Sequence, residues 1–381
     1  MRIAVVRREC SLKKAGAERY CVNLFRQLQK LGHDVTIVGE AIDEELRGEV
    51  AFLPVSVNKM TSWTKNESFA VNAAAVVREG RFDIAHGLSR VDGLDTYRLT
   101  DPLQTHWVNV YYRQPWNRWL QTWNPRHRAI FAIEKRLFGK TGPRRIIVQS
   151  QLDGRLLRDY FGVPEERLRR VCNGVDTNLF QPGDGSDRHA VREELGLDAE
   201  RPLLIFASMD FRRKGLGSLF AAMRQMKCQD AVLAVLGNGD IRRYQQIAKQ
   251  QGVEKRVHFL GRQSGMSRYY RAGDVFVLPT IYEPFPNVNL EAMACGTPVV
   301  TTATAGGADI VQDGVNGYVI PDAWSIPDLT ARIDALLELP ASQRQTMAAV
   351  CRATAMQFPV ERNARETVAV LEEAWREKFR V

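Results

Sequence analysis

Two glutamates separated by seven residues stand in the segment YEPFPNVNLEAMACGTPVVTT, and their surroundings suit a nucleotide site. Glu283 follows a short apolar run, and Glu291 falls within a helix predicted over residues 287–294. Backbone amides at the start of that helix are donors at its partly positive end, which suits a diphosphate. The Glu291 carboxylate can accept hydrogen bonds from ribose hydroxyls, and that of Glu283 from sugar hydroxyls. An isolated pair of acids is more often a cap and a solvated side chain, so the interpretation depends on the whole segment.

A cationic turn, FASMDFRRKGL, follows the first predicted strand of the second half of the chain. Arg213 and Lys214 in this turn can stabilise the negative charge that a leaving diphosphate gathers. Arg212 is an alternative to Arg213, and a solvated basic turn is the alternative to both. The chain has no D-x-D triplet, a pattern whose carboxylates can hold a divalent metal ion on a diphosphate. We therefore predict no metal and no cofactor beyond the substrate.

The segment around Glu283 and Glu291 resembles the E-x7-E signature of family 4 glycosyltransferases, because EPF, LEAMA and GTPVV flank the glutamates as they do in that family. The resemblance covers nearly the whole chain and is strongest over residues 203–319. Within the family, the chain looks most like the lipopolysaccharide-core glucosyltransferases of Gram-negative bacteria. The resemblance implies the GT-B fold, with two Rossmann-like domains facing each other across a cleft. It also implies retaining transfer of a hexose from a nucleotide sugar, by front-face attack with a donor phosphate oxygen taking the acceptor proton.

The same resemblance assigns the donor site. It places Arg213 and Lys214 on the diphosphate, and it gives Glu283 and Glu291 the sugar and ribose roles stated above. The other residues that it assigns to nucleotide-sugar binding are Gly16, Ala17, Gly237, Arg262, Phe285, Pro286, Asn287 and Val288. Family members usually have two glycines where this chain has Gly16 and Ala17, so the match in that turn is incomplete.

On the acceptor side, the segment GLDTYRLTDPLQTHW resembles a region where the lipopolysaccharide-core members carry an aspartate facing the reaction centre. Asp101 matches that aspartate, and His106 resembles the family's histidine that contacts the sugar. The resemblance thus makes both of them candidate catalytic residues, together with Glu283, Arg213 and Lys214. A turn-capping aspartate before Pro102 and a histidine packed in the protein interior remain the alternatives.

The elements that must position these residues follow an alternating pattern. An apolar run at residues 2–7, a helical pattern at 17–31 and a strand at 34–39 form a βαβ opening. Strand and helix signals alternate again from residue 203, which predicts a second parallel sheet. We therefore predict an α/β protein with domains at 1–175 and 201–381, joined by a linker rich in Gly, Asp and Pro at 176–200. Residues 327–379 read as helices, and we expect at least one of them to cross back to the first domain.

A basic, aromatic segment lies in the first half of the chain. Trp107, Trp116, Trp119 and Trp123 are four of the seven tryptophans, and residues 107–145 contain nine Lys or Arg and a single acid, Glu134. Tryptophan prefers the headgroup region of a bilayer and basic side chains are drawn to anionic lipid, so this segment is a candidate membrane-docking face. The alternatives are a site for a phosphorylated or lipid-linked saccharide acceptor, tryptophans in the core, and, ranked last, nucleic acid.

Composition limits the other possibilities. The six cysteines are scattered singly, and the chain has no apolar stretch of signal-peptide or membrane-spanning length. We therefore expect a cytoplasmic protein. The resemblance to lipopolysaccharide-core enzymes, with the tryptophan-rich segment, implies a peripheral position on the cytoplasmic face of the inner membrane. The net charge of +9 points to an acidic partner. GKT at 139–141 is not a P-loop, because Glu134 stands where the first glycine is needed, and no GxGxxG occurs. A sugar-nucleotide epimerase of the same fold and a non-catalytic sugar-nucleotide or membrane-binding protein stay as alternatives. The sequence does not fix the nucleobase, the sugar, the acceptor or the oligomeric state, although UDP-glucose or a similar UDP-sugar is our expectation.

Overall fold

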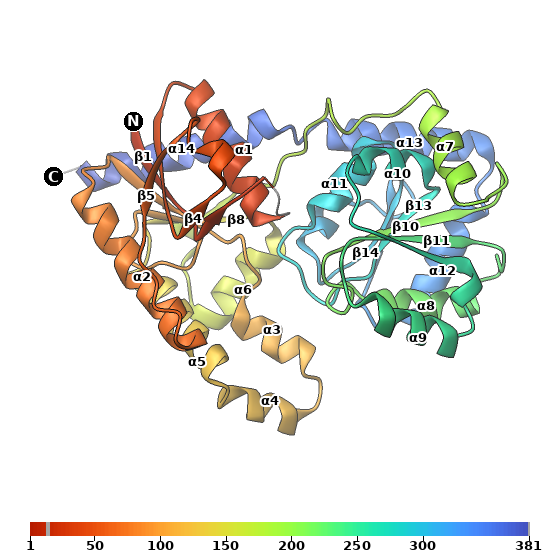
Figure 1. Cartoon of the computed structure of the whole chain (residues 1–381), viewed down its shortest axis with the longest axis horizontal. Helices are drawn as coiled ribbons and strands as arrows, with labels where there is room; N and C mark the ends of the chain where they lie inside the picture. The colour runs from red at the N-terminus through yellow and green to blue at the C-terminus, as the bar shows by residue number, and fades with distance from the viewer. Residues whose placement is uncertain (13–15, 380–381) are drawn as a thin grey trace. The chain divides into compact units, whose positions relative to one another are not determined.

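The computed structural model describes residues 1–12 and 16–379, and the chain folds into two compact units (Figure 1). Unit 1 comprises residues 1–173 together with the end of the chain from residue 360, and unit 2 comprises residues 174–359. Each unit contains one main parallel sheet with helices around it. The prediction of two Rossmann-like α/β domains is confirmed.

Unit 1 is built on a seven-stranded parallel sheet of order β5-β3-β1-β6-β7-β8-β9. The strands are β1 (Arg2–Val6), β3 (Asp34–Gly39), β5 (Ala51–Pro54), β6 (Ile84–Gly87), β7 (Thr96–Arg98), β8 (Arg145–Val148) and β9 (Leu168–Arg170). Two short strands, β2 (Glu9–Cys10) and β4 (Ala41–Ile42), form a separate pair, and η1 (Glu44–Leu46) and η2 (Glu165–Arg167) are single 3₁₀ turns. The helices are α1 (Ala17–Lys30), α2 (Ser62–Glu79), α3 (Gln104–Tyr111), α4 (Pro115–Thr122), α5 (Pro125–Leu137), α6 (Gln151–Phe161) and α14 (Val360–Phe379).

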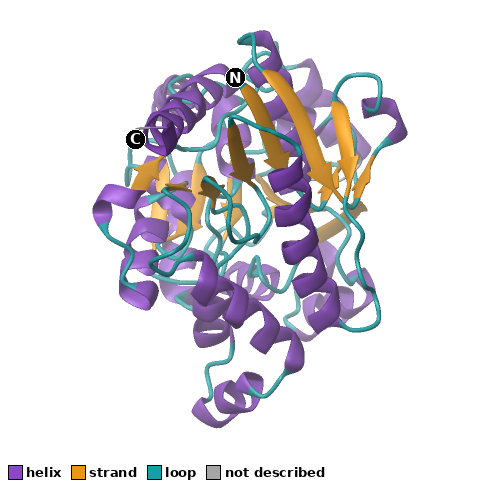
Figure 2. Cartoon of the chain, turned by 90° about the vertical axis from the view of Figure 1, so that its left-hand side faces the viewer, coloured by secondary structure: helices purple, strands orange, loops and turns teal. Residues whose placement is uncertain are grey.

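Helices cover both faces of this sheet. Successive side chains of a strand point to opposite sides, so each strand contributes to the core on both faces. Ile3 and Val5 of β1 pack in one apolar cluster with α1 and α14, whereas Ala4 and Val6 pack in another with Phe69 of α2. Figure 2 shows the strands between layers of helices. Strands buried on both faces are mostly apolar, although β6 and β7 carry buried polar side chains. Other polar residues of unit 1 follow the ends of the strands.

The helices after residue 326 were predicted correctly, and the last of them, α14, belongs to unit 1. Leu371 and Ala374 of α14 are fully buried in the cluster that contains β1 and β3. Glu373 of the same helix pairs with Arg145 of β8 at 3.1 Å and with Arg169 of β9. The C-terminal end of the chain therefore completes the core of the N-terminal unit.

Unit 2 contains a six-stranded parallel sheet of order β12-β11-β10-β13-β14-β15. Its strands are β10 (Leu203–Ala207), β11 (Val232–Leu236), β12 (Val257–Gly261), β13 (Val275–Leu278), β14 (Val299–Thr302) and β15 (Gly317–Ile320). Its helices are α7 (Ser186–Glu194), α8 (Leu216–Gln225), α9 (Ile241–Gln250), α10 (Met266–Ala272), α11 (Asn287–Ala294), α12 (Ile326–Leu337) and α13 (Ala341–Ala355), with 3₁₀ segments η3 (Glu254–Arg256) and η4 (Gly306–Ile310). The four central strands, β10, β11, β13 and β14, are buried along their whole length.

The residues predicted as a linker, 176–200, are not an open connection in the structure. They include α7, which packs against α10 within unit 2. Arg192 of α7 is 2% exposed and donates to Asp274 Oδ2 at 2.8 Å, which ties the helix to the loop before β13. The Gly, Asp and Pro residues form the turns on either side of α7, and the two units divide between Asn173 and Gly174. Within the described part of the chain, no helix is both long enough and apolar enough to cross a membrane.

Candidate functional site

Glu283 lies in the loop between β13 and α11 and binds two cations from another loop of unit 2. Its carboxylate oxygen Oε2 is 2.7 Å from Lys214 Nζ and also pairs with Arg213. The backbone holds the two loops together, because the Ile281 amide donates to the Arg213 carbonyl at 2.8 Å. The structure therefore brings together three residues that the sequence placed in a donor site, and Arg212, the alternative to Arg213, is exposed.

Burial shifts the pKa of Lys214 in this cluster. Its side chain is 9% exposed, and burial lowers its pKa to about 8 although the Glu283 carboxylate acts in the opposite direction. The neighbouring Arg213 guanidinium adds to the lowering. Lys214 thus changes its charge within an accessible pH range.

Helix α11 begins at Asn287, as predicted, and Glu291 lies on it one turn further along. Among the described residues no side chain caps the start of the helix, whose N-cap position is Pro286. Phe285 and Pro286 are buried, while Asn287 and Val288 are partly exposed at the helix start. Glu291 Oε2 accepts a hydrogen bond from Tyr270 Oη at 3.0 Å, a partner that the sequence did not indicate.

Gly237 is the residue of unit 2 whose backbone is most constrained. It follows β11 with φ of +122°, and a Cβ atom there would lie 1.6 Å from the Ser208 carbonyl oxygen. The Gly237 amide donates to the Gly261 carbonyl at 2.8 Å, which joins the ends of β11 and β12. Arg262 comes next after β12 and is exposed. These residues lie at the carboxyl ends of the strands, the side on which parallel sheets bind ligands.

Gly16 and Ala17, the remaining predicted donor-site residues, belong to unit 1. Gly16 has φ of +74° and is the N-cap residue of α1, and Ala17 is the first residue of the helix. A Cβ atom at Gly16 would meet nothing within 4 Å, so the backbone conformation and not crowding favours glycine there. The three residues before Gly16 lie outside the described residues.

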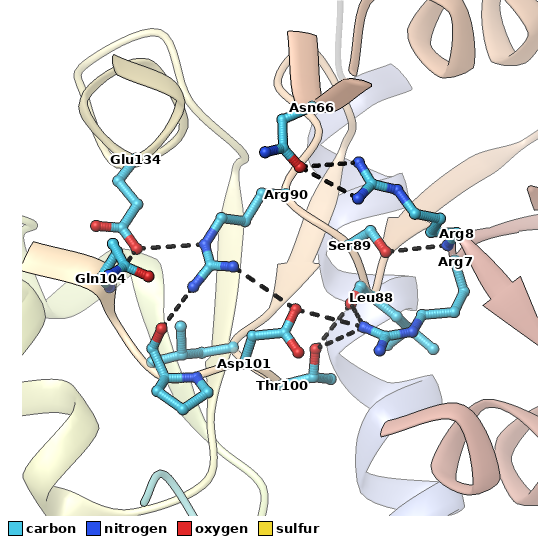
Figure 3. A network of polar contacts seen from close by, with 12 residues as sticks. Arg7, Arg8, Asn66, Leu88, Ser89, Arg90, Thr100, Asp101, Gln104 and Glu134 are labelled. Atoms are coloured by element: carbon cyan, nitrogen blue, oxygen red, sulfur yellow. Dashed lines mark hydrogen bonds and ion pairs between the residues drawn. The ribbon is translucent and has the colours of Figure 1, made fainter. Parts of the chain in front are cut away.

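Asp101 takes part in a polar network at the carboxyl ends of β1 and β6 (Figure 3). Its Oδ2 atom is 3.5 Å from Arg7 Nη1 and 3.7 Å from Arg90 Nη1. Burial disfavours the charged carboxylate, but the two guanidinium groups outweigh it and lower the pKa of Asp101. The Asp101 carboxylate is therefore ionised at neutral pH, and two guanidinium groups face it.

His106 is held apart from this network by a different partner. It lies on α3, where its Nδ1 is 3.1 Å from Tyr160 Oη and its ring packs edge-on against the Tyr160 ring. Burial lowers the pKa of His106 to about 4, so the imidazole is neutral at physiological pH. A carboxylate on α5 fixes the start of α3, since Glu134 accepts hydrogen bonds from the amides of Gln104 at 2.7 Å and Thr105 at 3.1 Å.

The tryptophan-rich segment does not form a core. Trp116, Trp119 and Trp123 are 64%, 61% and 62% exposed, and with Leu120 they follow the spacing of one helix face on and just beyond α4. Trp107 is partly buried and packs against Tyr111, with ring centroids 4.4 Å apart. The alternative that these tryptophans are core residues is therefore wrong for three of the four.

Several residues of the unit 1 network were not identified from the sequence. Arg7 and Arg8 follow β1 directly, Ser89 and Arg90 follow β6, and Asn66 comes from α2. The sequence did contain a signal for the first four, because charged or polar residues that directly follow a buried parallel strand lie at the ligand side of the sheet. Asn66 offered no such signal, since it is one polar residue among many on a helix.

Two family models match the chain, each over one unit or nearly so. The model described as "Glycosyltransferase Family 4" matches residues 15–179, and that of "Glycosyl transferases group 1" matches residues 187–351. The D-inositol 3-phosphate glycosyltransferase of Geodermatophilus obscurus is 29% identical over 93% of this chain and 84% of its own length. Lipopolysaccharide glucosyltransferase WaaG of Escherichia coli is 23% identical over 81% of this chain and 83% of its own. The chain spans about half the length of several other curated relatives that it matches.

Solved structures share the fold over the full chain. The crystal structure of WaaG superposes with a TM-score of 0.84 at 20% identity, covering 97% of this chain and 99% of that one. Anabaena Alr3699/HepE, solved in complex with UDP-glucose, superposes with a TM-score of 0.74 at 20% identity, covering 98% of this chain and 100% of that one. At this level of identity, the likeness establishes the fold.

The constraint at Gly237 yields a prediction. Gly237→Ala should lower the free energy of unfolding of unit 2 by about 1–3 kcal/mol, because the new Cβ requires both a strained φ and displacement of the Ser208 carbonyl. Gly217→Ala, in α8 of the same unit, is the matched control, since a Cβ there meets nothing within 4 Å. It should raise stability by about 0.4–1 kcal/mol. Urea unfolding followed by circular dichroism checks both, and equal effects of the two changes would contradict the assignment.

Proposed function

The chain belongs to family 4 of the glycosyltransferases, with the GT-B fold, and we propose that it moves a hexose from a UDP-sugar to a lipid-linked or lipopolysaccharide-core saccharide. Glucose is the first candidate for the hexose. Two similar proteins support this choice: HepE is solved in complex with UDP-glucose, and WaaG of Escherichia coli is a lipopolysaccharide glucosyltransferase.

The observation that carries the proposal is the cluster of Glu283, Arg213 and Lys214 beside the start of α11. In the proposed complex the diphosphate binds Arg213, Lys214 and the first amides of α11. Glu283 then exchanges its cationic partners for hydroxyls of the sugar, and Glu291 binds the ribose. The diphosphate competes with Glu283 for the same two cations, so donor binding and the positioning of Glu283 occur together.

We propose that transfer retains the configuration of the donor and needs no metal. As the bond from the sugar to the diphosphate breaks, the charge on the leaving group increases, and two fixed cations stabilise that charge more in the transition state than in the ground state. Asp101 is ionised and bound by two arginines, which suits it to accept a hydrogen bond from the acceptor. His106, neutral at physiological pH, suits a hydrogen-bonding role to the sugar rather than a charged one.

We propose further that α4 docks on an anionic membrane at the cytoplasmic face, where a lipid-linked acceptor is found. The exposed face of Trp116, Trp119, Leu120 and Trp123 is apolar, and α4 lies against α3 and α5 (Figure 1). Exposed cations precede α4 in the sequence at Arg113 and follow it on α5 at Arg126, Arg128 and Lys135. An exposed tryptophan-rich helix with basic neighbours has the composition of an interfacial helix.

A turnover experiment tests the activity. Purified protein in EDTA is offered UDP-, GDP- and ADP-hexoses with and without lipopolysaccharide-core oligosaccharide, and nucleotide release is followed. We expect UDP release that depends on the acceptor, with a product whose anomeric coupling constant in NMR matches that of the donor. Conversion of one UDP-sugar into another without acceptor would identify an epimerase. Binding without any turnover would contradict the proposal.

Lys214 should make donor binding depend on pH. Its pKa of about 8 means that the ammonium loses its proton as the pH rises through that value, so the affinity for UDP should fall. We expect a loss of about tenfold between pH 7.5 and 9.5, the usual strength of one hydrogen bond to a charged group. Lys214→Gln should bind weakly at pH 7.5, and its affinity should approach that of the wild type as the pH rises.

Calorimetry at several pH values measures this effect, and the ratio of wild type to variant cancels ionisation of UDP itself. The matched control is Lys227→Gln, because Lys227 is an exposed lysine of unit 2 paired with Glu338. Its affinity for UDP should follow the wild type throughout. A ratio between wild type and Lys214→Gln that stays constant with pH would show that Lys214 does not contact the diphosphate as a cation.

The membrane proposal has its own test. Replacing Trp116, Trp119 and Trp123 together with alanine should reduce binding to phosphatidylglycerol vesicles at least about tenfold, because three exposed apolar side chains lose their burial in the bilayer. Trp63→Ala, which removes a tryptophan that is 38% exposed on α2, is the control and should bind as the wild type does. Vesicle sedimentation measures both. Undiminished binding of the triple variant would exclude α4 as the docking element.

A further inference from the structure

A cavity of about 250 Å³ opens within unit 1 at the carboxyl ends of β1 and β6. Its lining combines three arginines, Arg7, Arg8 and Arg90, with three acids, two polar residues and three apolar ones. We propose that this cavity binds the acceptor saccharide by a negatively charged group, a phosphate or a carboxylate, with Arg8 as the principal partner of that group. The inference rests on the proposed transfer to a saccharide, and it specifies what the acceptor must carry.

The charges around the cavity single out Arg8. Arg7 is balanced by Glu18, whose carboxylate is 2.8 Å away, and by Asp101. Arg90 is balanced by the buried carboxylate of Glu134 at 3.2 Å. Both of these cations therefore already have close carboxylate partners.

Arg8 has no such close partner among the residues that the structure describes. Both terminal nitrogens of Arg8 donate at 3.1 Å to the same neutral acceptor, the amide oxygen of Asn66 (Figure 3). The nearest carboxylate, Glu40, is 4.0 Å away and is itself bound more closely by Lys59, at 2.8 Å. Arg8 thus brings an incompletely balanced positive charge to the cavity wall.

Hydrogen-bond donors that lack acceptors point to the same ligand chemistry. The Nε atoms of Arg7 and Arg8 are buried and have no hydrogen-bond partner among the described residues. The Arg7 side chain is only 8% exposed, so water does not readily serve its Nε group. Buried polar groups are normally satisfied, and anionic oxygens are the strongest acceptors for guanidinium donors. Arg8 Nε faces Glu40 Oε2 at 4.0 Å, so Arg7 Nε is the donor for which a ligand in the cavity can supply such an oxygen.

The rest of the lining suits a sugar rather than a bare ion. Phe69, Ile130 and Ile133 form an apolar wall, and the Arg8 guanidinium lies 4.8 Å from the centre of the Phe69 ring. Asp101, Glu18 and Ser89 supply oxygens that accept hydrogen bonds from hydroxyls. A saccharide presents an apolar ring face and hydroxyls, and its anionic substituent would complement Arg8. Ligand sites commonly combine such apolar walls with a few placed polar groups.

Binding experiments without turnover test this inference separately from the proposed activity. The probes are mannose 6-phosphate, galacturonate, uncharged mannose and inorganic phosphate, each titrated against the full chain by ligand-observed NMR. We expect the two charged sugars to bind at least about tenfold more tightly than mannose and than inorganic phosphate. The stronger of the two charged sugars identifies whether a phosphate or a carboxylate is preferred.

The variant Arg8→Gln should weaken binding of the charged sugars by about 10- to 100-fold and leave mannose unchanged. Arg155→Gln, an exposed arginine on α6 of the same unit, is the matched control for loss of one positive charge and should have no effect. UDP affinity, measured by calorimetry, should stay the same in both variants, and an unchanged circular dichroism spectrum and urea unfolding midpoint report that unit 1 is folded. If Arg8→Gln fails to fold, Asn66→Ala is used instead. Removing the amide that holds Arg8 in place should weaken the binding of the charged sugars several-fold.

Equal affinities for charged and uncharged sugars, or an unaltered affinity in Arg8→Gln, would overturn the inference. Inorganic phosphate binding as tightly as the sugar phosphate would overturn its saccharide part. These outcomes differ from failure of the proposed function, in which charged sugars bind as expected and no UDP is released in the turnover experiment.

Discussion

The burial of both parallel sheets on both faces is the constraint on which the chemistry of this protein depends. β1 has four buried residues in succession, and the central strands of unit 2 are buried throughout. Such strands favour apolar side chains along their length, so most charged groups follow the strand ends. The buried Arg98 within β7 is an exception, and it donates to the Val171 carbonyl at 3.0 Å. Arg7 and Arg8 come directly after β1, and the loop containing Glu283 follows β13. The same rule that forms the cores therefore places the functional groups of each unit at one edge of its sheet.

Charge balance is the second feature that the two candidate sites share. In unit 2, one carboxylate, Glu283, is shared by Arg213 and Lys214, and in unit 1 Asp101 is shared by Arg7 and Arg90. A partly buried cation without a partner is costly, whereas a buried ion pair contributes little net stability because desolvation offsets the attraction. Replacing such a carboxylate partner with an anionic group of a ligand therefore costs little free energy. Preformed ion pairs keep the cations in place before binding without holding them so strongly that a phosphate cannot compete.

Sequence reasoning succeeded where the signal was local. The bounds of α11 coincide with the predicted helix at 287–294, because a helix start, an apolar pattern and a glycine after its end all lie within one segment. The pairing of Glu283 with Arg213 and Lys214 was also within reach, since strand ends of a parallel sheet converge. The environment of Arg8 could not be predicted, because Asn66, Phe69 and Ile133 come from two helices whose packing no local sequence pattern determines.

The linker and the tryptophans show a different limit. Residues 176–200 have the composition of a connection, but their glycines and prolines form turns around α7, whose Arg192 is buried against Asp274. The spacing of Trp116, Trp119 and Trp123 predicts one helix face, and spacing alone does not say whether that face meets a core or solvent. That outcome depends on whether another element covers it, which is a property of the tertiary structure.

The end of the chain links the fold of unit 1 to its candidate site. Ile3 and Val5 of β1 pack in the same cluster as Leu371 of α14, and β1 ends at the arginine cavity. Glu373 reinforces this contact, because hydrogen bonds from Arg169 and Arg145 lower its pKa to about 2. In the sequence, unit 2 is inserted between the two parts of unit 1. The core of unit 1 is therefore complete only when the last helix, α14, packs against the first strand, β1. Contacts of such long sequence separation form late and at a high entropic cost. All eleven residues that line the cavity of unit 1 lie within the first 133 residues, so the last helix supports β1 without contributing to the lining.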